Sequence, residues 1–332
     1  MIRGRFPFVR FTVIGVVAAV LAACAGSAPS TGPRSGQAAY VPRVLDFVSQ
    51  PIVKPALLSI DYNTRALEYW PIQKGGSQKP VTIARNVANS GAMAADGNVV
   101  AITTATPSQV TLYDVQTRTK TTMPDPFGEA IDIAIGRDGS IYVLNLVPKQ
   151  NDSTITVYPG GSPHPQEVTC SLLGFSGSIA VDDESNIFYN GYFRNNSQGV
   201  IEISHEARSS SCRVLDLNPE TGYIGGVAID PKTDALATLS EPDLCAGGYE
   251  AEMTVYPKPY SKSTAHVHEM AGNCTGGLRL SADSGTVFYG DQDVSGSYSF
   301  VREATFPDGR NFGAYGGGAP SGFTTIPNTL PN

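Results

Sequence analysis

Polar side chains that could hold a metal ion recur where short apolar segments of this chain begin or end. Glu129 and Asp132 open one such segment, and Asn145 closes the next. Their carboxylate and amide oxygens are the ligands that Ca²⁺ prefers, provided that the fold brings them together. Asn and Asp at strand ends also hydrogen-bond to nearby backbone and begin turns, so a purely local role stays open. The candidate metal ligands are Glu129, Asn145, Asn190 and Asp291, and Asp61 and Asp132 occupy similar positions.

The sequence contains no complete set of residues for nucleophilic catalysis. There is no Gly-x-Ser-x-Gly motif to present a serine and no glycine-rich loop to bind phosphate. His266 and His268 are two residues apart, so on a strand they would project from one face and could chelate a metal. That strand is expected at the outside of the fold, where the alternative is a solvent-exposed face. No catalytic residue is therefore assigned.

One cysteine near the N-terminus is placed for lipid attachment. Three arginines lie in the first ten residues, and residues 11–23 are apolar but too few for a comfortable membrane span. The segment ends in Leu21-Ala22-Ala23-Cys24, which resembles the lipobox of bacterial lipoproteins. The resemblance implies cleavage after residue 23 and a lipid on Cys24. An ordinary secretory signal with an incidental cysteine is the alternative.

The residues that follow this cysteine predict a tether. Residues 25–40 are small, polar and rich in Pro and Gly, so they cannot bury enough apolar surface to fold. We expect a signal peptide over 1–23, a flexible tether over 24–40 and a folded domain over 41–332. In lipoproteins of bacteria with two membranes, an Asp after the lipidated Cys retains the protein in the inner membrane. Ala25 and Gly26 stand here instead, so the resemblance implies the outer membrane or the cell surface.

Composition favours many short strands and excludes some partners. Among 332 residues, only 16% are charged, while 35 Gly and 24 Pro supply turns. No stretch has the period of a long amphipathic helix. The formal charge is −7 and no basic patch is present, so the sequence offers no nucleic-acid surface.

A repeated pattern of strand, tight turn and strand dominates the chain. The second strand of each unit opens at residues 99, 141, 187, 235 and 287, and the turns before it carry Asp, Gly or Ser. Spacings of this size indicate a repeat architecture, and four short strands per unit suit a propeller blade. The first strand of each unit is rich in Ala, Gly and Ser, as expected where inner strands converge on an axis.

Counting a third strand raises the number of units from five to six. Six segments have this character: residues 67–71, 110–114, 155–159, 200–204, 253–257 and 298–302. Residues 57–61 precede the first of them and match a second strand, so their inner partner must come from elsewhere. Residues 322–326 have the right pattern, and the Gly-rich run 313–322 would be the connector to the axis. The sequence thus predicts an all-β, six-bladed propeller whose N- and C-terminal segments close one blade; seven blades, using residues 41–48, is the alternative.

The remaining four cysteines predict disulfides. An even number in an exported domain suggests two bridges, for which three pairings are possible, and no CxxC motif is present. Cys245 and Cys274 fall in connections at the same end of the propeller, so we pair them. Cys170 and Cys212 then form the second bridge, between outer strands of neighbouring blades.

Two units resemble NHL repeats. Ile133-Ala134-Ile135 with Asp138-Gly139-Ser140-Ile141-Tyr142-Val143, and Ile179-Ala180-Val181-Asp182 with Asn186-Ile187-Phe188-Tyr189, are similar to the core of that repeat. The related gluconolactonase-like propellers use a Glu, two Asn and an Asp on a central divalent metal. This chain lacks the Glu-Gly-Pro stretch of that family, and Gly277 stands where its ligand Asn would be.

These observations leave two functions from different classes. The first is an envelope-anchored lipoprotein, expected to be a monomer, that acts as a binding scaffold for a protein, peptide or glycan. Aromatic residues over 188–193 could supply its contact surface, although they equally suit a blade core. The alternative is a metal-dependent lactonase or hydrolase with Ca²⁺ or another divalent ion at the axis. A purely structural envelope component is a third possibility.

Overall fold

The fold was analysed in a computed structural model of the chain. It describes residues 52, 54–61, 63–72, 79–87, 91–147, 152–205, 212–217, 223–241, 251–271, 275–292, 299–316 and 320–326. These all belong to one compact unit, Arg43–Asn332. The expected signal peptide and tether, Cys24, Cys245 and Cys274 lie outside the described residues.

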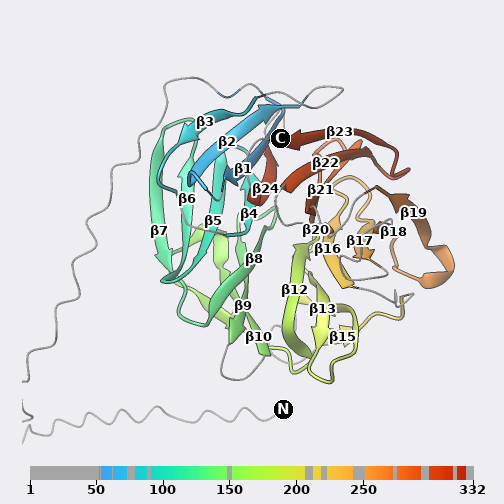
Figure 1. The fold of residues 1–332 in the computed structure, drawn as a ribbon. Coiled ribbons are helices and arrows are strands. Elements are labelled where there is room, and N and C mark those ends of the chain that lie inside the picture. Colours follow the sequence, from blue (N-terminus) through green and yellow to red (C-terminus); the bar gives the residue numbers. More distant parts are fainter. Residues whose placement is uncertain are drawn as a thin grey trace, which may run out of the picture. The chain divides into compact units, whose positions relative to one another are not determined.

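Six four-stranded antiparallel sheets form the blades of a propeller (Figure 1). We letter the strands of each blade A to D from the axis outward. Blade 1 is β24(Pro320–Ile326)-β1(Ala56–Asp61)-β2(Ala66–Pro71)-β3(Val81–Ala84), and blade 2 is β4(Met93–Asp96)-β5(Val99–Ala105)-β6(Ser108–Asp114)-β7(Thr119–Pro124). Blade 3 is β8(Glu129–Ile135)-β9(Ile141–Val147)-β10(Asp152–Tyr158)-β11(Gln166–Val168), and blade 4 is β12(Leu173–Val181)-β13(Ile187–Phe193)-β14(Gln198–Ile203)-β15(Cys212–Val214). Blade 5 is β16(Tyr223–Ile229)-β17(Leu236–Glu241)-β18(Ala251–Tyr256)-β19(His266–Met270), and blade 6 is β20(Thr275–Leu280)-β21(Thr286–Gln292)-β22(Ser299–Thr305)-β23(Asn311–Gly316).

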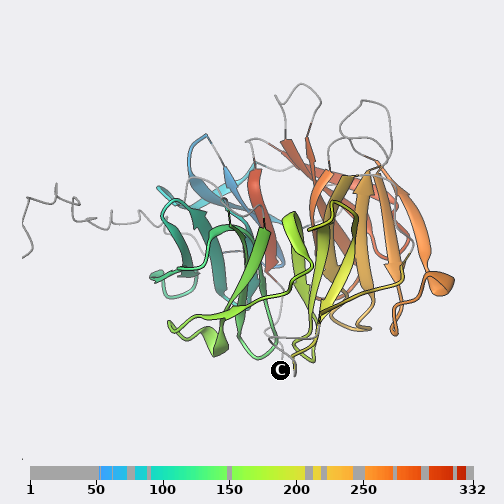
Figure 2. The same ribbon diagram turned by 90° about the horizontal axis from the view of Figure 1, so that it is seen from below.

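The A strands close the ring around the axis. Each contacts the A strands of both neighbouring blades, in the order β24, β4, β8, β12, β16, β20 and back to β24. The blades run between two ends of the ring (Figure 2). We call the end with the hairpins between A and B strands the A–B end. The opposite end, with the turns between B and C strands and the crossings between blades, is the B–C end.

The two ends of the folded domain meet in blade 1, as the sequence predicts. Residues of β24 pair with β1 in an antiparallel register from Ala56↔Ile326 to Asp61↔Pro320, so the last strand of the chain lies beside the first (Figure 1). One correction concerns the Gly-rich run 313–322, which the sequence assigns to a connector. Residues 313–316 complete β23 and residues 320–322 open β24, so only residues 317–319 separate the two strands.

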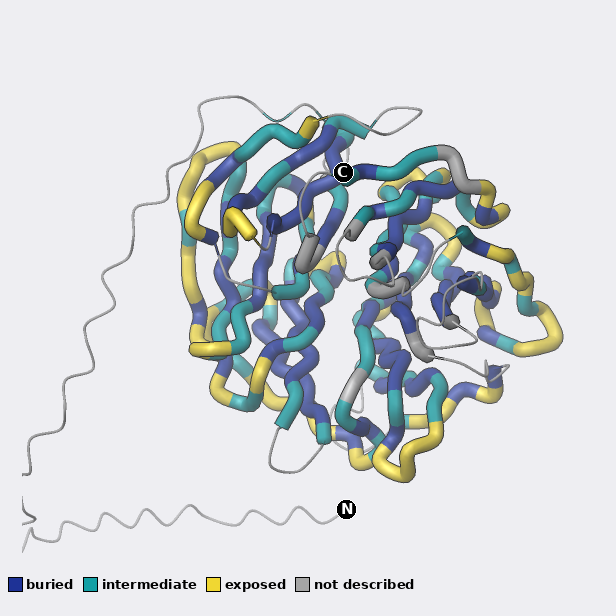
Figure 3. Tube along the Cα trace, in the orientation of Figure 1, coloured by how far each residue is buried: buried dark blue, intermediate teal, exposed yellow. Residues whose placement is uncertain are grey.

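The hydrophobic cores lie between neighbouring blades. One cluster joins Tyr142 and Ile155 of blade 3 to Ile179, Tyr189 and Ile201 of blade 4. The B strands are apolar along nearly their whole length, because each blade is packed on both faces against its neighbours. Burial is greatest along the B strands and least along the outer D strands (Figure 3).

Space at the axis is short enough to require glycine at one A strand. A Cβ atom at Gly226 of β16 would lie 2.8 Å from the Leu278 backbone nitrogen and 2.9 Å from the Gly277 carbonyl carbon. Real Cβ atoms do not approach backbone so closely. The small residues that marked the A strands in the sequence are thus explained by the contact of β16 with β20.

A disulfide joins blades 3 and 4. Cys170 follows β11, Cys212 opens β15, and their Cα atoms are 6.0 Å apart. This confirms the predicted Cys170–Cys212 pair. The bridge spans the crossing from one blade to the next, so it limits the separation of two sheets that otherwise touch only through side chains.

We expect loss of this bridge to destabilise the domain markedly. A disulfide that closes a loop of 42 residues stabilises by about 4 kcal/mol through the unfolded state. The Cys170→Ser/Cys212→Ser double variant should therefore lose that free energy of unfolding in denaturant titrations under oxidising conditions. Thr121→Ala, at an exposed position on β7, serves as a control outside the bridge. A double variant as stable as the wild type would contradict a stabilising role.

We expect the closure of blade 1 to depend on Phe323. This residue of β24 is buried against Trp70, Phe288 and Tyr315, so it joins the closing strand to blade 6. Phe323→Ala should lower the free energy of unfolding by about 3–5 kcal/mol because it leaves a cavity. The half-buried Thr325→Ala, on the same strand, should lower it by less than about 1 kcal/mol. Equal losses in the two variants would show that closure does not rest on this contact.

Candidate functional site

An arginine crosses the axis of the ring. Arg279 lies on β20, opposite β8 in the ring order, and its Nη2 is 3.1 Å from Oδ1 of Asp132 on β8. The same nitrogen donates to the carbonyl of Met93 on β4 at 3.1 Å, and Nη1 donates to the carbonyl of Leu278 at 2.9 Å. One guanidinium thus ties three A strands together. An arginine inside an apolar strand is the one sequence signal for this role, and it was not among the predicted site residues.

Asp132 has both carboxylate oxygens engaged. Oδ1 accepts from Arg279 and from the Ile133 backbone N–H at 2.8 Å, and Oδ2 accepts from the Ile179 N–H of β12 at 2.8 Å. The side chain therefore links blade 3 to blade 4 as well as to blade 6. A divalent cation at this carboxylate would have to displace the guanidinium, because the two positive charges would repel each other.

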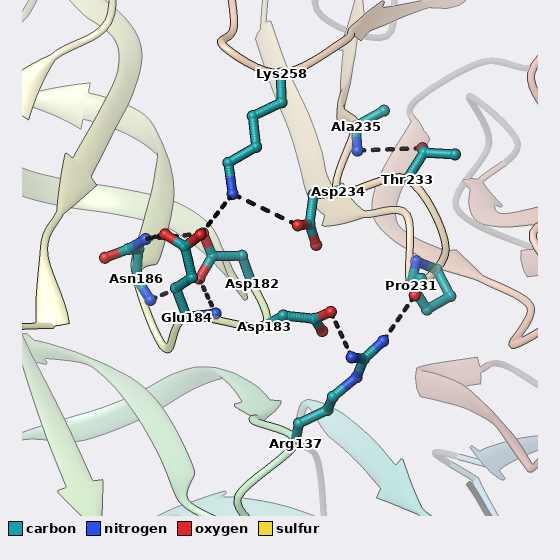
Figure 4. Close-up of polar contacts among 10 residues, drawn as sticks. All are labelled: Arg137, Asp182, Asp183, Glu184, Asn186, Pro231, Thr233, Asp234, Ala235 and Lys258. Carbon is teal, nitrogen blue, oxygen red and sulfur yellow. Dashed lines mark hydrogen bonds and ion pairs between the residues drawn. The ribbon is translucent and has the colours of Figure 1, made fainter.

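A second arginine reaches across blades at the A–B end. Arg137, in the hairpin after β8, pairs with Asp183 of blade 4 at 2.5 Å and donates to the Pro231 carbonyl of blade 5 at 2.9 Å (Figure 4). Its side chain is 61% exposed, whereas that of Arg279 is 18% exposed. Solvent therefore screens the outer contact far more than the axial one.

A lysine joins the hairpins of blades 4 and 5 at the same end. Lys258 is 3.1 Å from Glu184 and 3.5 Å from Asp234 (Figure 4). The hydrogen bond between Lys258 and Glu184 raises the pKa of the lysine and lowers the pKa of the glutamate. Burial raises the pKa of Asp183, and Arg137 opposes that rise. These contacts between turns fasten the blades to one another.

Three of the polar residues at B-strand ends are engaged separately. Asp61 accepts the backbone N–H groups of Asn63 and Thr64 at 2.7 and 2.9 Å, and so begins the turn to β2. Asn190 donates to the Gly226 carbonyl at 2.9 Å and thereby joins blades 4 and 5. Asp291 pairs with Arg302 on the adjacent C strand at 2.5 Å.

The other two candidates lie near each other but differ in burial. Glu129 is exposed at the start of β8, and Asn145 is fully buried on the adjacent β9. Asn145 donates to the Thr156 hydroxyl at 2.7 Å, and Thr156 donates to Asp125 at 2.7 Å. Asp125, in the crossing from β7 to β8, was not predicted from the sequence, because a single Asp before a Pro has the pattern of an ordinary turn residue.

Within the described part of the chain, no group of three or more His, Cys, Asp or Glu side chains is arranged to hold a metal ion. The strand carrying His266 and His268 is β19, the outer strand of blade 5, as expected. His266 is exposed and His268 is half-buried.

Two aromatic rings stack at the B–C end of blade 4. Phe175 and Tyr192 have ring centroids 5.0 Å apart and an interplanar angle of 19°, and both side chains are half-buried. Phe175 lies within a register shift of β12 between Leu173 and Gly177, where the strand bulges away from β13. A bulge re-aims a side chain that regular pairing would place elsewhere.

The surroundings of this pair are held firmly. The Tyr189 hydroxyl donates to the Tyr192 carbonyl at 2.7 Å, and the Arg194 N–H donates to the Leu172 carbonyl at 3.1 Å. Arg194 also pairs with Asp152 of blade 3 at 2.7 Å. Of the aromatic residues predicted for a contact surface over 188–193, Phe188, Tyr189 and Phe193 are buried in blade 4 and only Tyr192 reaches this position.

Comparison with known proteins shows the fold. No protein-family model and no curated protein sequence matches the chain. A chain of a nidogen/laminin complex has a TM-score of 0.63 at 15% identity, covering 81% of this chain and 97% of that one. TolB from Acinetobacter baumannii gives 0.61 at 13% identity, covering 82% and 66%, and a putative TolB from Agrobacterium tumefaciens gives 0.56 at 12% identity, covering 82% and 94%. The chain is a six-bladed β-propeller with TolB-like structural neighbours.

None of the helices among the described residues has the length and apolarity to cross a bilayer.

We expect the axial ion pair to stabilise the ring. Arg279→Met leaves Asp132 without its charged partner and should lower the free energy of unfolding by about 3 kcal/mol. Arg137→Met, at the exposed A–B end, should lower it by less than about 1 kcal/mol. Denaturant titration measures both, and a double-mutant cycle with Asp132→Asn isolates the pair. Additivity within about 0.5 kcal/mol in that cycle would show that the two side chains do not act together.

Proposed function

We propose that this protein is an interaction scaffold that binds a protein, peptide or glycan partner at the B–C end of blade 4. The observation that carries the proposal is the stacked pair Phe175 and Tyr192. Aromatic side chains dominate binding energy at interfaces because they bury a large area with few rotatable bonds. The β12 bulge and the contacts of Arg194 hold the pair in place before a partner arrives, which lowers the entropy cost of binding.

The closed ring supports a binding role. Arg279 and Arg137 connect A strands and hairpins of five blades, so the end that presents the aromatic pair belongs to a well-braced ring. Among the structural neighbours, one chain comes from a complex of nidogen with laminin and another is TolB. A likeness at this level of identity concerns the fold, and the binding role rests on the aromatic pair.

We further propose that the scaffold is anchored in the cell envelope through a lipid on Cys24, at the outer membrane or the cell surface. The support is the lipobox-like Leu21-Ala22-Ala23-Cys24 and the tether composition of residues 25–40. A flexible tether of this kind would allow the propeller to reorient its B–C end toward a partner.

The geometry of the axis makes a metal-dependent lactonase the weaker of the two candidate functions. Asp132, an acidic residue at the axis, is paired with Arg279. Of the other proposed ligands, Asp291 is paired with Arg302 and the amide of Asn190 with the Gly226 carbonyl. These contacts hold the candidates in separate blades.

A photo-crosslinking amino acid tests the binding surface directly. Placed at Tyr192 in the full-length protein in its native envelope, it should yield a discrete crosslinked product. Placed at Thr121, exposed on the outer strand β7, it should not. Phe175→Ala combined with the probe at 192 should reduce the yield at least about fivefold, because one ring of the stack is lost. No product at 192, or the same product at equal yield from 121, would refute the proposed surface.

A further inference from the structure

A buried carboxylate at the junction of blades 2 and 3 has no positively charged partner among the residues that the structure describes. Asp125 follows β7 in the crossing to β8 and is 5% exposed. Its Oδ1 accepts from the Thr156 hydroxyl at 2.7 Å and from the Phe127 N–H at 3.3 Å. Both donors are neutral. A buried carboxylate stabilised by neutral donors alone carries a large desolvation penalty.

In the cluster of Asp125, Asn145 and Thr156, two hydrogen-bond acceptor atoms have no donor among the described residues. Oδ2 of Asp125 and Oδ1 of Asn145 are buried, and neither accepts a hydrogen bond from any residue that the structure describes. The two side chains flank the same Thr156 hydroxyl, which donates to Asp125 and accepts from Asn145 at 2.7 Å each. Buried polar atoms without protein partners are uncommon, and a bound water or ion is one way in which proteins satisfy them.

The neighbouring backbone closes tightly over the cluster. A Cβ atom at Gly128 would lie 2.6 Å from the Leu146 carbonyl oxygen and 2.9 Å from Cβ of Asn145, so the crossing lies directly on β9. The Asp125 N–H donates to the Ser108 carbonyl at 3.1 Å, and the hydroxyl of Ser108 is likewise buried without a partner. The crossing is thus held by its backbone to β6 and by the Asp125 side chain to Thr156 of β10.

We propose that this cluster binds a monovalent alkali cation, with Asp125 Oδ2 and Asn145 Oδ1 as ligands. Carboxylate, amide and hydroxyl oxygens are hard donors, which suit alkali and alkaline-earth ions rather than transition metals. A single carboxylate supplies one negative charge, which one monovalent ion neutralises. A bound ion would satisfy both leftover acceptors and would fasten blade 2 to blade 3.

The proposal differs from the axial metal considered above. The cluster lies between two blades, and its ligands come from the crossing and from a B strand. Of the residues first predicted to hold a metal, it uses only Asn145. Glu129, close in sequence, is exposed and takes no part.

Thermal unfolding in different salts tests the site. At equal ionic strength and neutral pH, NaCl or KCl should raise the wild-type Tm above its value in tetramethylammonium chloride by about 2–4 °C. Asp125→Asn, which keeps the shape and removes the charge, should abolish this difference. Glu129→Gln is the matched control, because it removes a nearby exposed carboxylate and should leave the difference unchanged. ²³Na relaxation on the wild type, displaced by K⁺, gives a second readout that does not require the variant to fold.

Three results would overturn the proposal. One is an equal Tm in all three salts with no ²³Na broadening, which means that water fills the site. Another is a salt effect that persists in Asp125→Asn, which assigns the ion elsewhere. A third is a salt-independent stability that falls as pH rises through neutrality in the wild type but not in Asp125→Asn. That outcome would mean that Asp125 keeps a proton in the folded state, since a group with a raised pKa loses its contribution as pH rises.

Discussion

The axis of the ring is the place on which the remaining structure depends, and Arg279 is the residue that joins its sides. Six A strands converge there, and side chains large enough to fill the space from one strand would collide with those of the next. Glycine at position 226 admits the backbone of β20, and the guanidinium of Arg279 then bonds to β4 and β8 on the far side. An extended, planar cation with several donors suits this position, because backbone carbonyls and one carboxylate surround it.

The interactions between blades differ in kind from the axis of the ring to its outside. At the axis, Asp132 bonds to blades 4 and 6 with little exposure to solvent. At the A–B end, Arg137 and Lys258 join neighbouring hairpins in contact with water, where each pair contributes less. Farther out, the Cys170–Cys212 disulfide connects blades 3 and 4 covalently. The sheets move apart with distance from the axis, so side-chain packing between them weakens there. Stronger or longer connections are therefore needed at the outside of the ring.

This distribution separates the parts of the molecule that maintain the ring from the part available for recognition. Of the polar residues at strand ends that first suggested metal ligation, Asp132 and Asn190 connect blades, Asp61 begins a turn and Asp291 pairs within its own blade. The aromatic pair of Phe175 and Tyr192 contributes to no such connection, and a bulge places it at the B–C end. The Asp125 cluster also differs from these connecting residues, because Asp125 Oδ2 and Asn145 Oδ1 accept no hydrogen bond from any described group.

The sequence by itself determined the blade count, the closing strand and one disulfide, because these follow from local strand-and-turn patterns that recur along the chain. The period of the A–B hairpins predicts five units, and the extra C strand with residues 322–326 predicts the sixth. Tertiary structure alone decided which polar residues meet. Arg279 and Asp132 are 147 positions apart, and Asp125 reaches Thr156 only because one blade crosses to the next. Such contacts depend on how the ring closes, and no short-range pattern in the sequence encodes that closure for an individual side chain.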